Sequence, residues 1–207
     1  MVRLTRLGAL ALAGLLLGAA ARAEEQLTLP VPDGWQTVTS LATPKLRMSS
    51  FAVPGPDGVE KLSFEWFAAG LTDDLDPFDL VEQVAGTIRR NCRGGTEQPV
   101  FSGLENDYPT VVRLLLCPEV NGEDPPRGEL LMMKAIQGAT GFWIVVRGRD
   151  LAAEDTPDPA TLRGIVARWS EAMRAIRLCD PDTAAHPCPG VPSGTRRDAR
   201  TPPRPDS

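Results

Sequence analysis

Two apolar runs, Glu129–Gln137 (ELLMMKAIQ) and Phe142–Gly148 (FWIVVRG), are separated by the four residues Gly138-Ala139-Thr140-Gly141. A short linker with glycine at both ends is typical of the turn of a β-hairpin between antiparallel strands. The stretch therefore predicts a pair of adjacent strands, and the remaining elements can be placed around that pair.

The other candidate strands are rich in apolar and β-branched residues and are bounded by turn residues. They are Leu27–Val31, Lys45–Val53, Lys61–Phe67, Val100–Leu104 and Thr110–Cys117. The second and third of these flank the turn sequence Pro54–Gly58, so they are expected to form another hairpin. The polar, proline-containing segment Pro118–Arg127 predicts a surface loop.

Two segments have the apolar spacing of amphipathic helices, and an Asp-Pro dipeptide opens each of them. Asp76-Pro77 precedes the stripe Leu80, Val81, Val84, Ala85 and Ile88, and Asp158-Pro159 precedes Leu162, Ile165, Val166, Trp169, Met173 and Ile176. Aspartate can cap the free N–H groups of a first turn, and proline is tolerated at the first helical position. Gly94-Gly95 is expected to stop the first helix.

The order of elements is strands, a helix, strands and a second helix, with links short enough for hairpins. This order predicts an α+β fold, in which a mainly antiparallel β-sheet has two main helices packed on it. Residues 24–180 are expected to form a single domain, which is long enough to bury a core. Residues 181–207 contain seven prolines and no Ile, Leu, Phe, Met or Trp, so a disordered tail is expected there.

The beginning of the chain has the pattern of a secretory signal peptide. Arg3 and Arg6 precede the uncharged run Leu7–Ala21, and small residues flank Arg22 in the sequence Ala-Arg-Ala that ends at Ala23. Cleavage is therefore expected after Ala23, and an uncleaved N-terminal anchor is the alternative. Because the run is shorter than the ~20 residues that span a bilayer, no stable membrane insertion is expected after cleavage. The mature protein is expected to be periplasmic or secreted.

The charge of the chain bears on its partners. The 207 residues include 22 basic and 27 acidic side chains, for a formal net charge of -5. Removal of residues 1–23 takes away three arginines and no acid, which lowers that charge to -8. An acidic exported protein has no electrostatic attraction for nucleic acid or for anionic lipid. Neither is expected as a partner.

The four cysteines, Cys92, Cys117, Cys179 and Cys188, form an even number. In an exported protein this predicts two disulfide bonds. Three pairings are possible, and proximity in the sequence favours Cys92 with Cys117 and Cys179 with Cys188. The first bond would connect the end of a helix to a strand, and the second would fix the start of the tail.

The chain has one histidine, His186, and the sequence places it in the expected tail. Ser-His-Asp and Cys-His catalysis need a rigidly held base, so no catalytic residue and no enzymatic activity are expected. No cofactor or metal is expected either. Reduced Cys179 and Cys188 could bind zinc or copper together with His186, but an oxidising compartment favours their disulfide.

Two charged clusters allow both a structural and a functional interpretation. They are the carboxylates Asp73, Asp74, Asp76 and Asp79, and the arginines Arg113, Arg147 and Arg149. The carboxylates lack the spacing and the glycine of a calcium loop, so a helix cap is the favoured interpretation. For the arginines, solvated strand edges are the favoured interpretation, and convergence on an anion, if their strands are neighbours, is the alternative.

The chain has the stretch Leu29–Trp35 (LPVPDGW), an early hairpin, a helix that begins at Pro77, later strands and a closing helix. This layout resembles the PsbP-like fold over roughly residues 27–178. That group includes an extrinsic photosystem subunit, a Ran-binding nuclear transport factor and DcrB-type periplasmic proteins. The stretch from Lys134 to Val146 is also similar to exported proteobacterial proteins of unknown function. The resemblance implies an α/β/α sandwich and a non-enzymatic domain that docks on a partner or stabilises an assembly. It assigns no functional residue.

The leading hypothesis is an exported, non-enzymatic accessory domain that binds another protein of the cell envelope. One alternative is a binding protein for a small apolar or anionic ligand held between sheet and helix, with Met132, Phe142 or Trp143 in the pocket. Another is an immunity or inhibitor protein whose acidic surface blocks a toxin or an enzyme.

Overall fold

The structure is a computed structural model that describes residues 25–55, 58–70, 75–123, 125–152, 158–183 and 185–189. The predicted signal peptide lies outside the described residues, and so does the part of the predicted tail from residue 190 onward. Asp73 and Asp74, two members of the carboxylate cluster, also lie outside them. None of the helices in the described ranges is long and apolar enough to cross a membrane.

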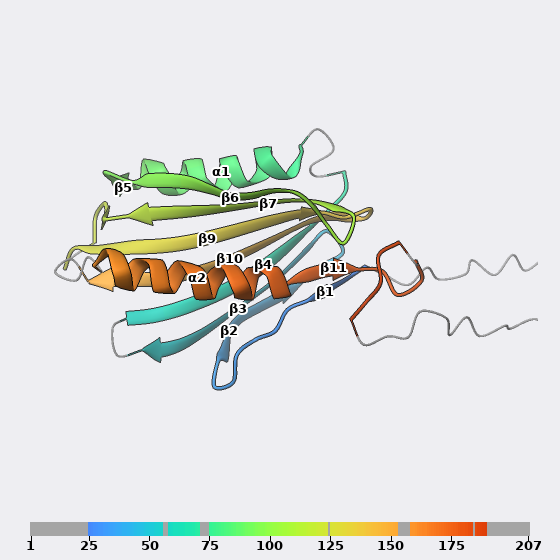
Figure 1. The fold of residues 1–207 in the computed structure, drawn as a ribbon, viewed down its shortest axis with the longest axis horizontal. Coiled ribbons are helices and arrows are strands. Elements are labelled where there is room, and N and C mark those ends of the chain that lie inside the picture. The colour runs from blue at the N-terminus through green and yellow to red at the C-terminus, as the bar shows by residue number, and fades with distance from the viewer. Residues whose placement is uncertain are drawn as a thin grey trace, which may run out of the picture.

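A seven-stranded, entirely antiparallel sheet forms the centre of the molecule (Figure 1). From one edge to the other, its strands are β2 (Gln36–Ala42), β3 (Leu46–Gly55), β4 (Gly58–Ala68), β10 (Gly141–Ala152), β9 (Arg127–Gln137), β7 (Tyr108–Cys117) and β6 (Thr96–Glu105). The predicted hairpin of β9 and β10 lies in the middle of this order, with Phe142 opposite Gln137. The second predicted hairpin is the pair β3 and β4.

A third hairpin joins β6 to β7 through Asn106 and Asp107. Both residues have positive φ angles, of 50° and 62°. Asparagine and aspartate tolerate this backbone region better than most residues because their short side chains can hydrogen-bond locally. The tight turn keeps β6 antiparallel to β7 and makes β6 one edge of the sheet.

Two helices, α1 (Pro77–Arg90) and α2 (Pro159–Ala175), begin at the two predicted Asp-Pro dipeptides. The backbone N–H of Asp79 donates to the Asp76 side chain at 2.8 Å, and the N–H of Ala160 donates to the Asp158 side chain at 2.8 Å. The helix α1 ends before the predicted Gly94-Gly95 stop. The backbone N–H of Asn91 donates to the carbonyl of Ile88 at 2.9 Å at the end of the helix, and a short strand follows at once.

The helices cover opposite faces of the sheet. Val81 and Ala85 of α1 pack with Met133 of β9, whereas Trp169 of α2 packs with Met132 of β9. Since successive residues of a strand point to opposite faces, these contacts place one helix on each side. The expectation of an α+β fold is confirmed, and the layers are those of an α/β/α sandwich.

Two small sheets complete the fold. The strand β1 (Gln26–Thr28) pairs with β11 (Arg177–Cys179), and the two lie together at one end of the molecule (Figure 1). The strand β5 (Cys92–Arg93) pairs with β8 (Glu119–Val120), which lies within the segment predicted to be a loop. These pairs join segments far apart in sequence, and each is close to a disulfide bond.

The structure pairs Cys92 with Cys117 and Cys179 with Cys188, the two pairings that sequence proximity favours. The first bond connects the chain just after α1 to the end of β7. Because disulfides persist in oxidising compartments, the two bonds are consistent with an exported protein.

The folded domain extends beyond the predicted boundary at residue 180. Residues 181–183 and 185–187 belong to a loop closed by the bond between Cys179 and Cys188, and the N–H of Asp180 donates to the carbonyl of His186 at 2.8 Å. The His186 ring stacks on Tyr108 with 4.2 Å between ring centres. Composition alone predicts disorder here because the loop has few apolar residues, but the disulfide and these contacts order it instead.

Candidate functional site

The three arginines that were candidates for an anion site do not converge. Arg113 of β7 lies on the α1 face, where it pairs with Glu97 at 2.6 Å and lies over the Phe78 ring. Arg147 of β10 lies on the α2 face and pairs with Glu60 at 3.0 Å. Arg149, two residues along β10, shares the face of Arg147. The alternative of an anion site shared by all three arginines therefore does not hold for Arg113, because odd-numbered residues of β7 and β10 face opposite sides.

The other predicted site residues have structural positions. Asp76 and Asp79 form a reciprocal capping box at the start of α1. Cys179 and Cys188 are bonded to each other, and the ring of His186 lies within hydrogen-bonding distance of the carbonyl of Asn106. Within the described ranges, no group of three or more His, Cys, Asp or Glu residues could hold a metal ion.

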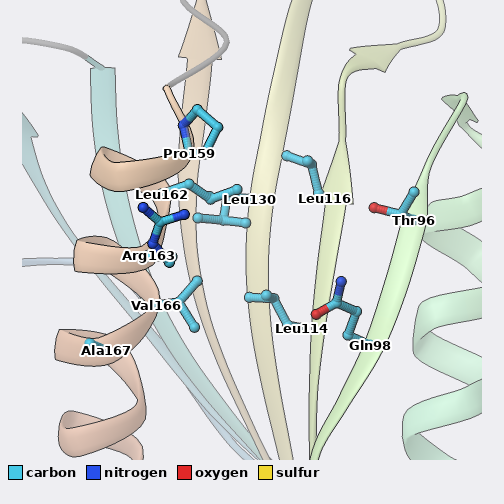
Figure 2. Close-up of a pocket in the computed structure, with 10 residues that line it drawn as sticks. All are labelled: Thr96, Gln98, Leu114, Leu116, Leu130, Pro159, Leu162, Arg163, Val166 and Ala167. Atoms are coloured by element: carbon cyan, nitrogen blue, oxygen red, sulfur yellow. The ribbon is translucent and has the colours of Figure 1, made fainter.

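An open apolar groove lies on the α2 face between α2 and the edge strand β6; we call it the docking groove. It consists of two hollows of about 480 and 320 Å³ that follow one another along α2. The first is lined by Thr96, Gln98, Leu114, Leu116, Leu130, Pro159, Leu162, Arg163, Val166 and Ala167 (Figure 2). The second is lined by Val100, Phe101, Glu105, Val112, Ser170, Met173 and Arg174.

The floor of the docking groove is apolar because of the period of two in β7. Leu114 and Leu116 share one face of that strand with Val112, and all three point toward the side that carries α2. Figure 2 shows Leu162 and Val166 of α2 on one side of Leu130 and the two β7 leucines on the other. Since α2 packs mainly against β4, β10 and β9, these leucines are only partly covered.

The wall formed by α2 has an unusual distribution of side chains. Arg163, Ala167, Ser170 and Arg174 recur at helical spacing and line the groove. The two central side chains are small, and an arginine lies at each end. The sequence shows Arg163 and Arg174 only as members of the polar side of an amphipathic helix, so their position beside an apolar floor was not predicted.

The opposite wall is the edge strand β6. Among the described residues β6 pairs with β7 alone, and its pairing shifts by one residue at Val100. Val100 and Phe101, which line the second hollow, are 40% and 37% exposed. Exposed apolar side chains beside an unpaired strand edge are features of a surface that binds another chain.

A buried lysine fixes the far end of the groove. Lys134 of β9 is fully buried, and its Nζ donates to the carbonyls of Met173 and Ile176 at 2.7 Å each. The same Nζ pairs with the carboxylate of Glu105, which lines the second hollow. Burial lowers the pKa of Lys134, and the Glu105 carboxylate opposes this effect. The lysine thereby holds the C-terminal end of α2 next to β9 and to the end of β6.

The residues expected to line a ligand pocket do not line this one. Met132, Phe142 and Trp143 are all buried in the core. The groove instead uses half-buried leucines that the sequence assigns simply to the interior of a strand. The only signal in the sequence is the run Leu114-Leu115-Leu116, in which residues on both faces of β7 are apolar.

No protein-family model and no curated protein matches the chain. Among solved structures, it is similar to PA94 from Pseudomonas aeruginosa, a protein of unknown function, with 17% sequence identity and a TM-score of 0.44. That match covers 70% of this chain and 85% of the other. It is also similar to LpqN, a Mycobacterium tuberculosis protein involved in cell envelope biogenesis, with 16% identity and a TM-score of 0.39, over 76% of this chain and 83% of the other. Neither likeness assigns a function to this chain.

Proposed function

We propose that this chain is an exported, non-enzymatic accessory domain that binds another protein of the cell envelope in the docking groove. The observation that supports the proposal is the open apolar groove between α2 and β6. Covering such a surface removes apolar area from water, which is the main driving force of protein association. An inhibitor of a toxin or enzyme would be one kind of such a domain.

The shape of the groove favours a protein segment over a small molecule. The two hollows follow one another along α2, and the exposed apolar residues Val100 and Phe101 of β6 line the second of them. Small-molecule sites are typically enclosed and bury most of their ligand. An elongated surface with an open side suits several consecutive residues of a chain.

The ionisable groups of the groove support a binding role. The described lining residues that can carry charge are Glu105, Arg163 and Arg174. Glu105 pairs with Lys134, and arginine remains protonated at physiological pH. These groups do not make up the pair of acid and base that proton transfer between side chains requires.

A second candidate function is the binding of a small apolar ligand. The volume of the first hollow, about 480 Å³, supports it, because ligand pockets have volumes of ~300–1,000 Å³. The Arg163 side chain at its rim could orient a polar or anionic end group.

A crosslinking experiment separates the two functions. A photo-crosslinking amino acid replaces Gln98, which lies on the β6 wall. The protein is produced in a cell that exports it and removes the predicted signal peptide. The variant Ala167→Trp fills the groove from an exposed position, and Ala175→Trp places the same ring on an exposed position of α2 that does not line it. We expect a protein adduct that Ala167→Trp abolishes and Ala175→Trp retains.

The opposite results are equally clear. If no protein adduct forms, or if both tryptophan variants retain it equally, the groove is not the protein-binding site. A small molecule that co-purifies in native mass spectrometry and is lost only in Ala167→Trp would establish the second function instead.

A further inference from the structure

We propose that the protein segment bound in the docking groove is acidic, with apolar side chains on the leucine floor and carboxylates that pair with Arg163 and Arg174. This inference rests on the proposed function, because it names the kind of segment that the groove holds. It is carried by the charges on the α2 wall, their spacing, and the small side chains between them.

Among the residues that the structure describes, the two arginines of the groove have no carboxylate partner. Neither Arg163 nor Arg174 forms an ion pair with any residue in the described ranges, although the chain has more acidic than basic side chains. Glu171 lies three residues before Arg174, yet no ion pair joins them. Arg113 and Arg147, in contrast, each pair with a glutamate. The α2 wall therefore presents two cations that are available to a bound partner.

The described residues that line the groove carry little negative charge that would repel an acidic segment. Glu105 is the carboxylate that lines the second hollow, and the buried Lys134 ammonium already compensates its charge. The β6 wall of the first hollow contributes the neutral side chains of Thr96 and Gln98. Along the described part of the lining, an incoming carboxylate would thus meet neutral, positive or already compensated groups, even though the whole chain is acidic.

The spacing of the arginines sets the length of the segment. Arg163 and Arg174 are eleven positions apart on α2, which is three helical turns or about 16 Å. Ala167 and Ser170 lie between them and leave room above the floor. An extended chain spans this distance in about five residues. Carboxylates near both ends of such a segment could reach both arginines while the residues between them contact Leu114 and Leu116.

The test uses the full-length protein with the photo-crosslinking amino acid at position 98. The double variant Arg163→Glu/Arg174→Glu reverses both groove charges, and Arg163→Gln/Arg174→Gln removes them if the reversed protein is unstable. The control Arg90→Glu/Arg168→Glu makes the same change in net charge at two exposed arginines that do not line the groove. Melting curves establish that each variant is folded.

We expect charge reversal to decrease the yield of the protein adduct roughly tenfold, because the glutamates at positions 163 and 174 would repel the carboxylates of the segment. The control should leave the yield unchanged. Higher salt should also lower the adduct yield of the protein that keeps both arginines, because salt screens the attraction before the crosslink forms. Mass spectrometry of the adduct should identify a segment with acidic residues on both sides of an apolar stretch. Three results would overturn the inference. The first is a crosslinked segment without excess acidic residues, and the second is an equal loss of adduct in the charge-reversed variant and in its control. The third is an anionic small molecule bound in the groove in place of a protein. The first two of these outcomes would leave protein binding itself established, whereas the absence of any adduct would refute the proposed function.

Discussion

Lys134 is a buried charge whose partners come from distant parts of the chain. Its Nζ contacts the carboxylate of Glu105, 29 positions away, and two carbonyls at the end of α2 that are 39 and 42 positions away. The sequence shows one lysine in an apolar run, which predicts a strand but not these partners. Asp76 and Asp158, by contrast, accept hydrogen bonds from N–H groups two or three residues away, so both helix caps could be predicted.

Replacement of Lys134 should be costly for stability. We expect Lys134→Ala to lower the free energy of unfolding by ~3–5 kcal/mol, because it leaves two helix carbonyls and the Glu105 carboxylate without their donor. The measurement is urea denaturation at neutral pH. Lys61→Ala is the matched control: Lys61 is half-exposed and pairs with Asp150 at 2.8 Å, so we expect a loss of less than ~1 kcal/mol. Equal losses in the two variants would show that Lys134 does not support the fold as described.

At the scale of elements, the sequence predicts what depends on local contacts. Both helices begin where an aspartate caps the first turn, and two hairpins form where glycine-rich turns separate alternating segments. The pairings of β1 with β11 and of β5 with β8 were missed. Strands of two or three residues are too short to show a period, and their partners lie 26 or more positions away. Only the assembled fold brings them together.

The helix α2 contains a glycine that local physics should penalise. At Gly164, an added Cβ would meet only the guanidinium of Arg168 at 3.6 Å, which is ordinary contact with a mobile side chain. We therefore expect Gly164→Ala to raise the free energy of unfolding by about 0.5–1 kcal/mol, since alanine restricts the unfolded chain more than glycine does. Thermal denaturation measures the change. Gly34→Ala is the contrasting variant and should destabilise, because Gly34 has a φ of +83° that alanine rarely adopts. A destabilised Gly164→Ala would mean that α2 needs the glycine for packing.

At the scale of the whole molecule, the position of the docking groove depends on how much of a face one helix covers. The helix α2 lies over the middle of the sheet, and β6 with part of β7 remains open beside it (Figure 1). The sequence predicts α2 and β7 separately but does not determine the distance between them. Proximity in the sequence does favour the disulfide pairings that the structure shows, because each bond closes a short stretch of chain.

Three remote segments meet at Tyr108, which makes this side chain a reporter on the assembled molecule. It is the only tyrosine of the chain, it is buried, and it stacks on His186 of the C-terminal loop. Burial raises the pKa of Tyr108 above its ordinary value of 10.0, and the nearby carboxylate of Glu25 raises it further. Because the folded-state pKa is the higher one, the stability linked to this group is fully present below about pH 10 and is lost as the pH rises through the folded-state value.

Absorbance of the tyrosinate measures this titration without interference from a second tyrosine. We expect the native protein to form tyrosinate only well above pH 10, and the variant Cys179→Ser/Cys188→Ser to form it closer to the ordinary value. Without its disulfide the C-terminal loop can leave Tyr108, and water then reaches the phenol. The variant Cys92→Ser/Cys117→Ser removes a bond of similar kind on the other face of the sheet. It should cost about 3 kcal/mol of stability through the loop that it opens, but at a pH where it is folded it should leave the tyrosine titration unchanged. If both double variants shifted the titration equally, the effect would come from general loosening of the fold, and the C-terminal loop would not be what protects Tyr108.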